Sequence, residues 1–128
     1  VYCDGLPVAD APQTQMGANL RLNVAHGFSM GVDVQYNDRM YADFDPSTRN
    51  NAEDPATSYR IPGYHLLGAD LSWTMSGRHT LNVFLRADNL LDVSYIERGK
   101  DGATHDLESF RGYWGFGRVI SFGIRYRL

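Results

Sequence analysis

The fold is decided by the last eleven residues of this 128-residue chain, Arg118-Val-Ile-Ser-Phe-Gly-Ile-Arg-Tyr-Arg-Leu128. Every second side chain here is apolar: Ile120, Phe122, Ile124, Tyr126 and Leu128. The positions between them hold Ser121, Gly123, Arg125 and Arg127. Because successive side chains of a β-strand point to opposite faces, the stretch predicts a strand with one apolar and one charged face. A helix would scatter the same residues around its axis.

Four earlier segments alternate in the same way, at residues 19–24, 28–37, 67–74 and 81–88. In the last of these Phe84 is an apolar exception on the polar face. Each strand is expected to be about 9–12 residues long, which is close to what a tilted membrane strand needs. The pattern predicts an all-β fold, an antiparallel meander of about five long strands.

The connections between the strands alternate between short and long. Ala25-His26-Gly27 suits a three-residue hairpin with glycine in the left-handed position, and residues 75–79 suit a second short turn. Residues 42–58 and 93–117 form two long connections rich in turn-forming residues. Short turns at one end of a sheet and long loops at the other are typical of transmembrane barrels in outer membranes. The sequence therefore predicts part of such a barrel, with its C-terminus at the periplasmic, short-turn end.

Composition narrows the class of protein. The net charge of −3 argues against a nucleic-acid binder, which would carry a basic stripe. The single cysteine, Cys3, cannot form an internal disulfide and reads as incidental. No apolar run is long enough for a membrane-spanning helix, but this criterion does not detect transmembrane strands, because their apolar and polar residues alternate. Val1-Tyr-Cys-Asp-Gly5 does not resemble a signal peptide, so we expect the chain to be the C-terminal portion of a longer exported protein.

Residues 81–128 resemble the C-terminal end of TonB-dependent outer-membrane receptors. Ala87-Asp-Asn-Leu-Leu-Asp92, followed by Tyr95, is similar to the Asn-Leu-Phe-Asp element of that family. Gly117-Arg118 before the last strand is similar to its final Gly-Arg element, and Ile61-Pro-Gly-Tyr64 before residues 67–73 also fits. The chain departs from the family at Leu91, where phenylalanine is commoner, and at Leu128, where an aromatic residue is usual.

The resemblance implies that residues 1–128 are the C-terminal part of a barrel of about 22 strands filled by an N-terminal plug. No plug domain and no TonB-box segment occur in this sequence. The implied partners are outer-membrane lipid and lipopolysaccharide, the missing strands and plug, the TonB complex and the barrel-assembly machinery. That machinery would read the terminal strand through Phe122, Ile124, Tyr126 and Leu128.

The polar face of the predicted sheet carries seven charged residues: Arg21, Asp33, Asp70, Arg86, Asp88, Arg125 and Arg127. On membrane strands these must face the lumen, because a charge on the lipid face costs about 2–4 kcal/mol near the midplane. They form either a mutually paired network or a surface that contacts the plug or a ligand.

The long segment 95–117 is the best candidate for ligand contact, because it mixes rigid aromatic rings with charges. The candidate residues are Tyr95, Arg98, His105, Arg111 and Trp114. The sequence has no metal-ligand spacing, no nucleotide-binding loop and no nucleophile motif, so we expect no cofactor, no metal and no catalysis.

The function expected from these features is active uptake of a scarce nutrient, an iron-siderophore, a corrinoid or a glycan, across the outer membrane of a Gram-negative cell. Two alternatives are open. A passive porin-like barrel needs the same strands, and a soluble β-sandwich or lipocalin-like binding protein would also alternate, with its apolar face in a packed core.

Overall fold

A computed structural model describes residues 8–43 and 58–128, and this part of the chain is built from β-strands without a helix. Its contacts divide the chain into two compact units. The loop unit comprises Val1–Gln15, Asn37–Tyr64 and Ser94–Gly115, and the sheet unit comprises Met16–Tyr36, His65–Val93 and Phe116–Leu128. Cys3 and residues 44–57 of the first long connection lie outside the described residues.

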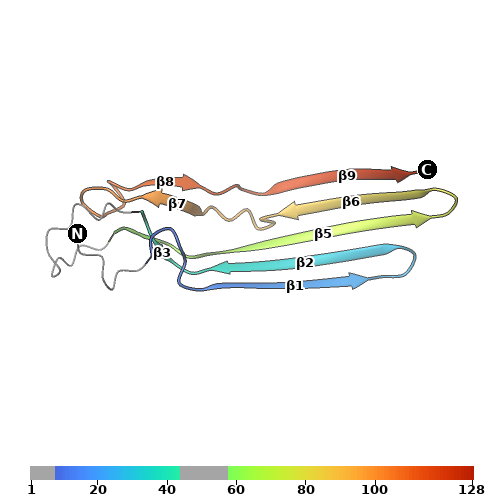
Figure 1. The fold of residues 1–128 in the computed structure, drawn as a ribbon, viewed down its shortest axis with the longest axis horizontal. Helices are drawn as coiled ribbons and strands as arrows, with labels where there is room; N and C mark the ends of the chain where they lie inside the picture. The colour runs from blue at the N-terminus through green and yellow to red at the C-terminus, as the bar shows by residue number, and fades with distance from the viewer. Residues whose placement is uncertain (1–7, 44–57) are drawn as a thin grey trace. The chain divides into compact units, whose positions relative to one another are not determined.

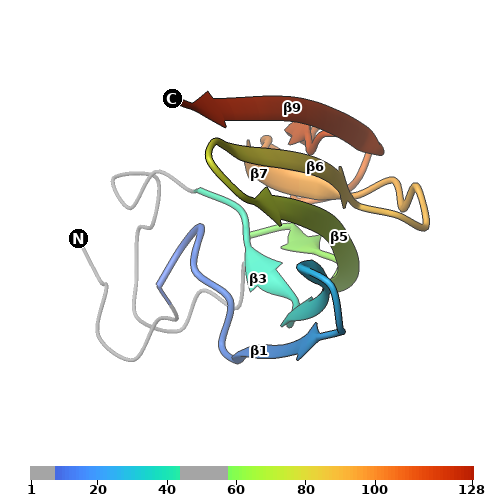
Figure 2. The ribbon, with the colours of Figure 1, turned by 90° about the vertical axis from the view of Figure 1, so that its right-hand side faces the viewer.

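The sheet unit contains the predicted antiparallel meander. Its strands are β1 (Gln15–Asn23), β2 (Phe28–Asn37), β5 (Tyr64–Ser76), β6 (Thr80–Asp88) and β9 (Val119–Arg127). They lie side by side in chain order, β1-β2-β5-β6-β9 (Figure 1). Viewed along the strands the sheet is twisted, as the chirality of the backbone requires (Figure 2). The prediction of five long strands in a meander is confirmed, although β5 is longer at both ends than the alternation indicated.

The register of the sheet follows from its turns. The N–H of Val24 donates to the carbonyl of Phe28 (2.8 Å), and the N–H of Thr74 donates to that of Gly27 (2.8 Å). Farther along, Trp73 pairs with Val83, which pairs with Ile124. Continuing these pairings along the ladders aligns three rows across five strands: Val24-Phe28-Trp73-Val83-Ile124, Leu22-Met30-Leu71-Leu85-Phe122 and Leu20-Val32-Ala69-Ala87-Ile120. Every position in these three rows is therefore apolar.

The turn between β1 and β2 has the predicted geometry. Gly27 has φ of 77° and His26 has φ of 65°, so both residues adopt the left-handed conformation. A β-carbon at position 27 would also overlap the carbonyl oxygen of Thr74 on β5. Only glycine satisfies both constraints, which explains why it follows the histidine here.

Replacing Gly27 by alanine is expected to reduce the free energy of unfolding by about 1–2 kcal/mol from the backbone conformation alone. The overlap with Thr74 adds to that loss, because the backbone must shift. Urea unfolding of the refolded protein measures the effect. Gly77→Ala is the matched control in the β5–β6 turn, since Gly77 has ordinary φ and the nearest atom to an added β-carbon lies 3.9 Å away. Equal losses in the two variants would contradict the explanation.

The loop unit holds two small sheets that the sequence did not predict, and the second of them lies within the predicted long connection 93–117. β3 (Met40–Tyr41) pairs with β4 (Arg60–Ile61), and β7 (Ile96–Lys100) pairs with β8 (Arg111–Trp114). The buried residues Met40, Ala42 and Ile61 form a small core against which Tyr59, Ile96 and Phe110 pack. The second long connection therefore contains a hairpin. It is stabilised by packing of Ile96 and Phe110 against this core, which the sequence pattern of the connection does not indicate.

None of the described residues belongs to a helix long and apolar enough to cross a membrane.

Candidate functional site

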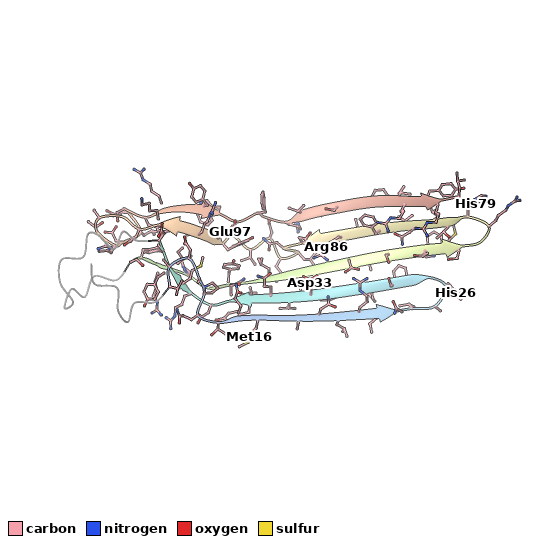
Figure 3. All side chains as sticks on the ribbon, viewed as in Figure 1. Met16, His26, Asp33, His79, Arg86 and Glu97 are labelled. Atoms are coloured by element: carbon pink, nitrogen blue, oxygen red, sulfur yellow. The ribbon has the colours of Figure 1, made fainter. Side chains whose placement is uncertain are left out.

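The centre of the polar face is a network of ion pairs. Arg86 on β6 reaches Asp88 at 2.7 Å, Asp33 on β2 at 3.3 Å and Asp70 on β5 at 3.8 Å. Arg21 on β1 reaches the same Asp70 at 2.9 Å. Five of the seven charged residues predicted for this face are thus brought together. Figure 3 shows Asp33 and Arg86 within the span of the strands, and His26 and His79 at the two short turns.

Two glycines make room for the carboxylates of this network. Asp70 leans over Gly31 of β2, and Asp33 leans over Gly68 of β5, so that a β-carbon at either glycine would overlap a carboxylate. In the register set by the first turn Arg21 lies opposite Gly31, and its guanidinium therefore reaches Asp70 across the strand between them. A side chain in the middle of that row would block the ion pair between β1 and β5.

The remaining charges of the polar face lie toward the short-turn end. Arg125 is opposite Asn82 and Arg127 is opposite Thr80. Neither arginine forms an ion pair with any residue that the structure describes. The apolar exception Phe84 is explained by its partner Gly123, because the phenyl ring occupies the space where a β-carbon of residue 123 would lie.

The apolar face is exposed along all five strands. Leu20 is 61% exposed, Leu71 is 39% exposed and Phe122 is 66% exposed, although each belongs to a continuous apolar row. A large area of exposed apolar side chains on one face of a sheet marks a surface that contacts another protein or a membrane. Trp73 lies at the short-turn end of this face, where its indole N–H donates to the carbonyl of His26 at 3.2 Å.

The Asn-Leu-Leu-Asp turn at the end of β6 joins the two ends of the second long connection. Asn89 is buried, has φ of 49°, and exchanges hydrogen bonds with the main chain of Val93: its amide donates to the carbonyl and its oxygen accepts from the N–H, both at 2.9 Å. The same amide donates to the carbonyl of Phe116 at 3.1 Å. Asp92 accepts from the N–H of Arg118 at 2.8 Å. The turn thereby fixes where the chain leaves β6 and where it enters β9.

The predicted ligand residues occupy different positions in the loop unit. Tyr95 stacks on Tyr64 with ring centroids 4.3 Å apart, so its ring serves packing. Arg98 and Arg111 lie on one face of the β7–β8 hairpin, and Trp114 is exposed at the end of β8, opposite Ile96. His105 pairs with Asp101, which also accepts from the N–H of Tyr59. The structure therefore groups Arg98 with Arg111 and separates the other three.

The tip of this connection is held by local bonds. The N–H of Ser109 donates to the carboxylate of Asp106 at 2.9 Å, and this bond, with the hydroxyl of Thr104, holds the pKa of Asp106 below its ordinary value. No group of three or more His, Cys, Asp or Glu side chains in residues 8–43 and 58–128 has an arrangement that could hold a metal ion.

The candidates from the sequence did not include Lys100 and Tyr113, which lie on the same face of the β7–β8 hairpin as Arg98 and Arg111. Lys100 lies opposite Arg111, and Tyr113 lies opposite Arg98. The alternation of Arg111 and Tyr113 with Gly112 and Trp114 was the available signal, but a four-residue segment is too short to distinguish from a loop.

Comparison with models of protein families, with curated proteins and with solved structures gave no match to this chain.

Proposed function

We propose that this chain forms part of the wall of a transmembrane β-barrel in the outer membrane of a Gram-negative cell. The observation that carries the proposal is the set of three apolar rows, exposed across five strands that are 9 to 13 residues long. Strands of about 9–11 residues suffice to cross the hydrocarbon core when they are tilted. Lipid chains are the apolar phase that this face fits.

The opposite face supports the same proposal. Its charges would lie in the barrel interior, where an unpaired charge is costly and a paired one is tolerated. The network of Asp33, Asp70, Asp88, Arg21 and Arg86 meets that requirement for five of the seven charges. Arg125 and Arg127 lie toward the short-turn end of the face. Because such barrels have at least about eight strands, further strands would have to pair with the outer edges of β1 and β9.

We further propose that the barrel is that of a TonB-dependent transporter, which takes up a scarce nutrient such as an iron-siderophore, a corrinoid or a glycan. This step rests on the resemblance of the Asn-Leu-Leu-Asp turn and the terminal strand to that family. In such a protein the chain would supply barrel wall, two outer connections and the strand used in assembly. The plug and the TonB complex would drive transport, and the chain itself would have no catalytic role.

The membrane proposal is tested through Trp73, which lies on the apolar face. The sequence has two tryptophans, so Trp114→Phe leaves Trp73 as the only indole. In vesicles of lipids brominated near the headgroup end of the acyl chain, we expect the fluorescence of Trp73 to be strongly quenched. Trp73→Phe is the matched variant that leaves Trp114 of the loop unit as the only indole. Unquenched Trp73, together with cooperative unfolding in the absence of detergent, would support a soluble β-sandwich instead.

The transporter proposal has a separate test in the reading frame upstream of Val1. A plug-sized region preceded by a TonB-box segment would support energised uptake. A barrel preceded by neither would be a passive, porin-like channel, and the proposal of active transport would be wrong.

A further inference from the structure

The β7–β8 hairpin presents three cations and one aromatic ring on a single face. Opposite residues of an antiparallel pair project to the same side. Arg98 lies opposite Tyr113, and Lys100 lies opposite Arg111, so these four side chains form what we call the hairpin face. Their spacing, about 5 Å across the strands and about 7 Å along them, brings the three charges within reach of one small molecule.

The cations of the hairpin face are poorly compensated. Like charges directly opposite each other destabilise a strand pair, and Lys100 and Arg111 are in that position. None of the three cations forms an ion pair within residues 8–43 and 58–128. Arg98 instead lies over the Tyr113 ring, 5.4 Å from its centroid.

Three carboxylates lie near the hairpin face without neutralising it. Glu97 occupies the bulge of β7, and Asp43 pairs with Lys100 through the main chain only. Asp101 is committed elsewhere, because it accepts from the N–H of Tyr59 and pairs with His105. No carboxylate in the described part of the chain therefore occupies these cations.

The other side of the hairpin is packed, which holds in place the main chain that carries the cations. The ring of Phe110 fills the space beside Gly99 and Gly112, and stacks on Tyr59 with centroids 4.6 Å apart. On the far edge of β7 the N–H of Asp43 donates to Gly99 at 2.9 Å. A binding surface built on such a supported strand pair loses little backbone freedom when it binds a ligand.

We infer that the hairpin face binds a small oxyanion with two or more charged oxygens, of the polycarboxylate or polyphosphate class. Arg98 and Arg111 can each hold a carboxylate or phosphate in a bidentate manner, and Lys100 adds a point charge between them. Tyr113 gives the ligand an aromatic surface. As the ligand site of an uptake protein the inference rests on the function proposed above, but as an anion site it rests on the hairpin alone.

Titration calorimetry of the detergent-solubilised protein with citrate and with pyrophosphate tests the site. We expect saturable binding of at least one of them, weakened at least about tenfold in Lys100→Gln/Arg111→Gln, because two charge-assisted contacts are lost. The matched control is Arg39→Gln/Arg78→Gln, which removes the same charge from exposed positions off the hairpin and should change the affinity less than about twofold.

Three outcomes would overturn the inference: no saturable binding of either anion, equal weakening in both double variants, or binding only to vesicles that carry lipopolysaccharide. The last outcome would assign the face to lipid headgroups. Because calorimetry in detergent requires no bilayer, lost anion binding with intact Trp73 quenching contradicts the anion site only. Retained anion binding with no quenching contradicts the barrel only.

Discussion

Replacing Asn89 by alanine is expected to reduce the free energy of unfolding by about 4–5 kcal/mol. Three hydrogen bonds to the main chain of Val93 and Phe116 disappear, and each contributes about 1 kcal/mol. Alanine must also adopt a φ of 49°, which costs about 1–2 kcal/mol more than for asparagine, whose short polar side chain suits this conformation. Because Asn89 is buried, water cannot replace the lost partners.

The loss is measured by reversible urea unfolding of the refolded protein. Proteolysis within residues 93–116 should accelerate in parallel, because Asn89 joins both ends of that connection. Asn82→Ala is the matched control on β6, the strand that precedes this turn; its amide donates one hydrogen bond, to Thr74, and the expected loss is about 1 kcal/mol. A loss at Asn89 no larger than at Asn82 would mean that the turn does not fix the connection.

The long strands could be predicted from sequence because each carries its own evidence. Alternation over six or more residues specifies a strand and assigns each side chain to a face. The first hairpin also specified its register, since Ala25-His26-Gly27 places Val24 opposite Phe28. These features are local, and the structure confirms them.

The small sheets of the loop unit could not be predicted for the same reason. β7, Ile-Glu-Arg-Gly-Lys, has a bulge and a single apolar residue, and β3 and β4 are two residues each. They form because Met40, Ala42 and Ile61 come together from distant positions. The pattern within a single segment cannot predict a core whose residues come from distant parts of the chain.

The ion pairs of the polar face could be predicted only in part. Alternation placed Arg21, Asp70 and Arg86 on one face, but it could not predict which of them pair, because the register between β2 and β5 depends on a long connection. Gly31 and Gly68 were the missed signal: a glycine inside a strand marks a place where another group approaches closely. Each admits a carboxylate from the neighbouring strand. The ligand roles of Tyr95, Arg98, His105, Arg111 and Trp114 stay predictions.

Replacing Leu20 by arginine is expected to reduce the free energy of unfolding in lipid vesicles by about 2–4 kcal/mol. Leu20 lies near the middle of β1 on the apolar face and is 61% exposed. In a bilayer the guanidinium would face hydrocarbon and lose its hydration without gaining a partner. Urea unfolding of the protein in vesicles, monitored by tryptophan fluorescence, measures the change.

The neighbouring substitution Asn19→Arg tests whether the loss depends on the face to which the arginine projects or on its presence anywhere in β1. Residue 19 projects to the polar side, where the register set by the first turn places it opposite Asp33. The ion-pair network there has three carboxylates and two guanidinium groups, so an added cation reduces its net negative charge, and we expect little or no loss of stability. If the two variants were equally stable in vesicles, the apolar face would not be the lipid face. If both were strongly destabilised, β1 would have to be enclosed on both sides, and the rows that end at Leu20 and Leu22 would be covered by protein instead of lipid.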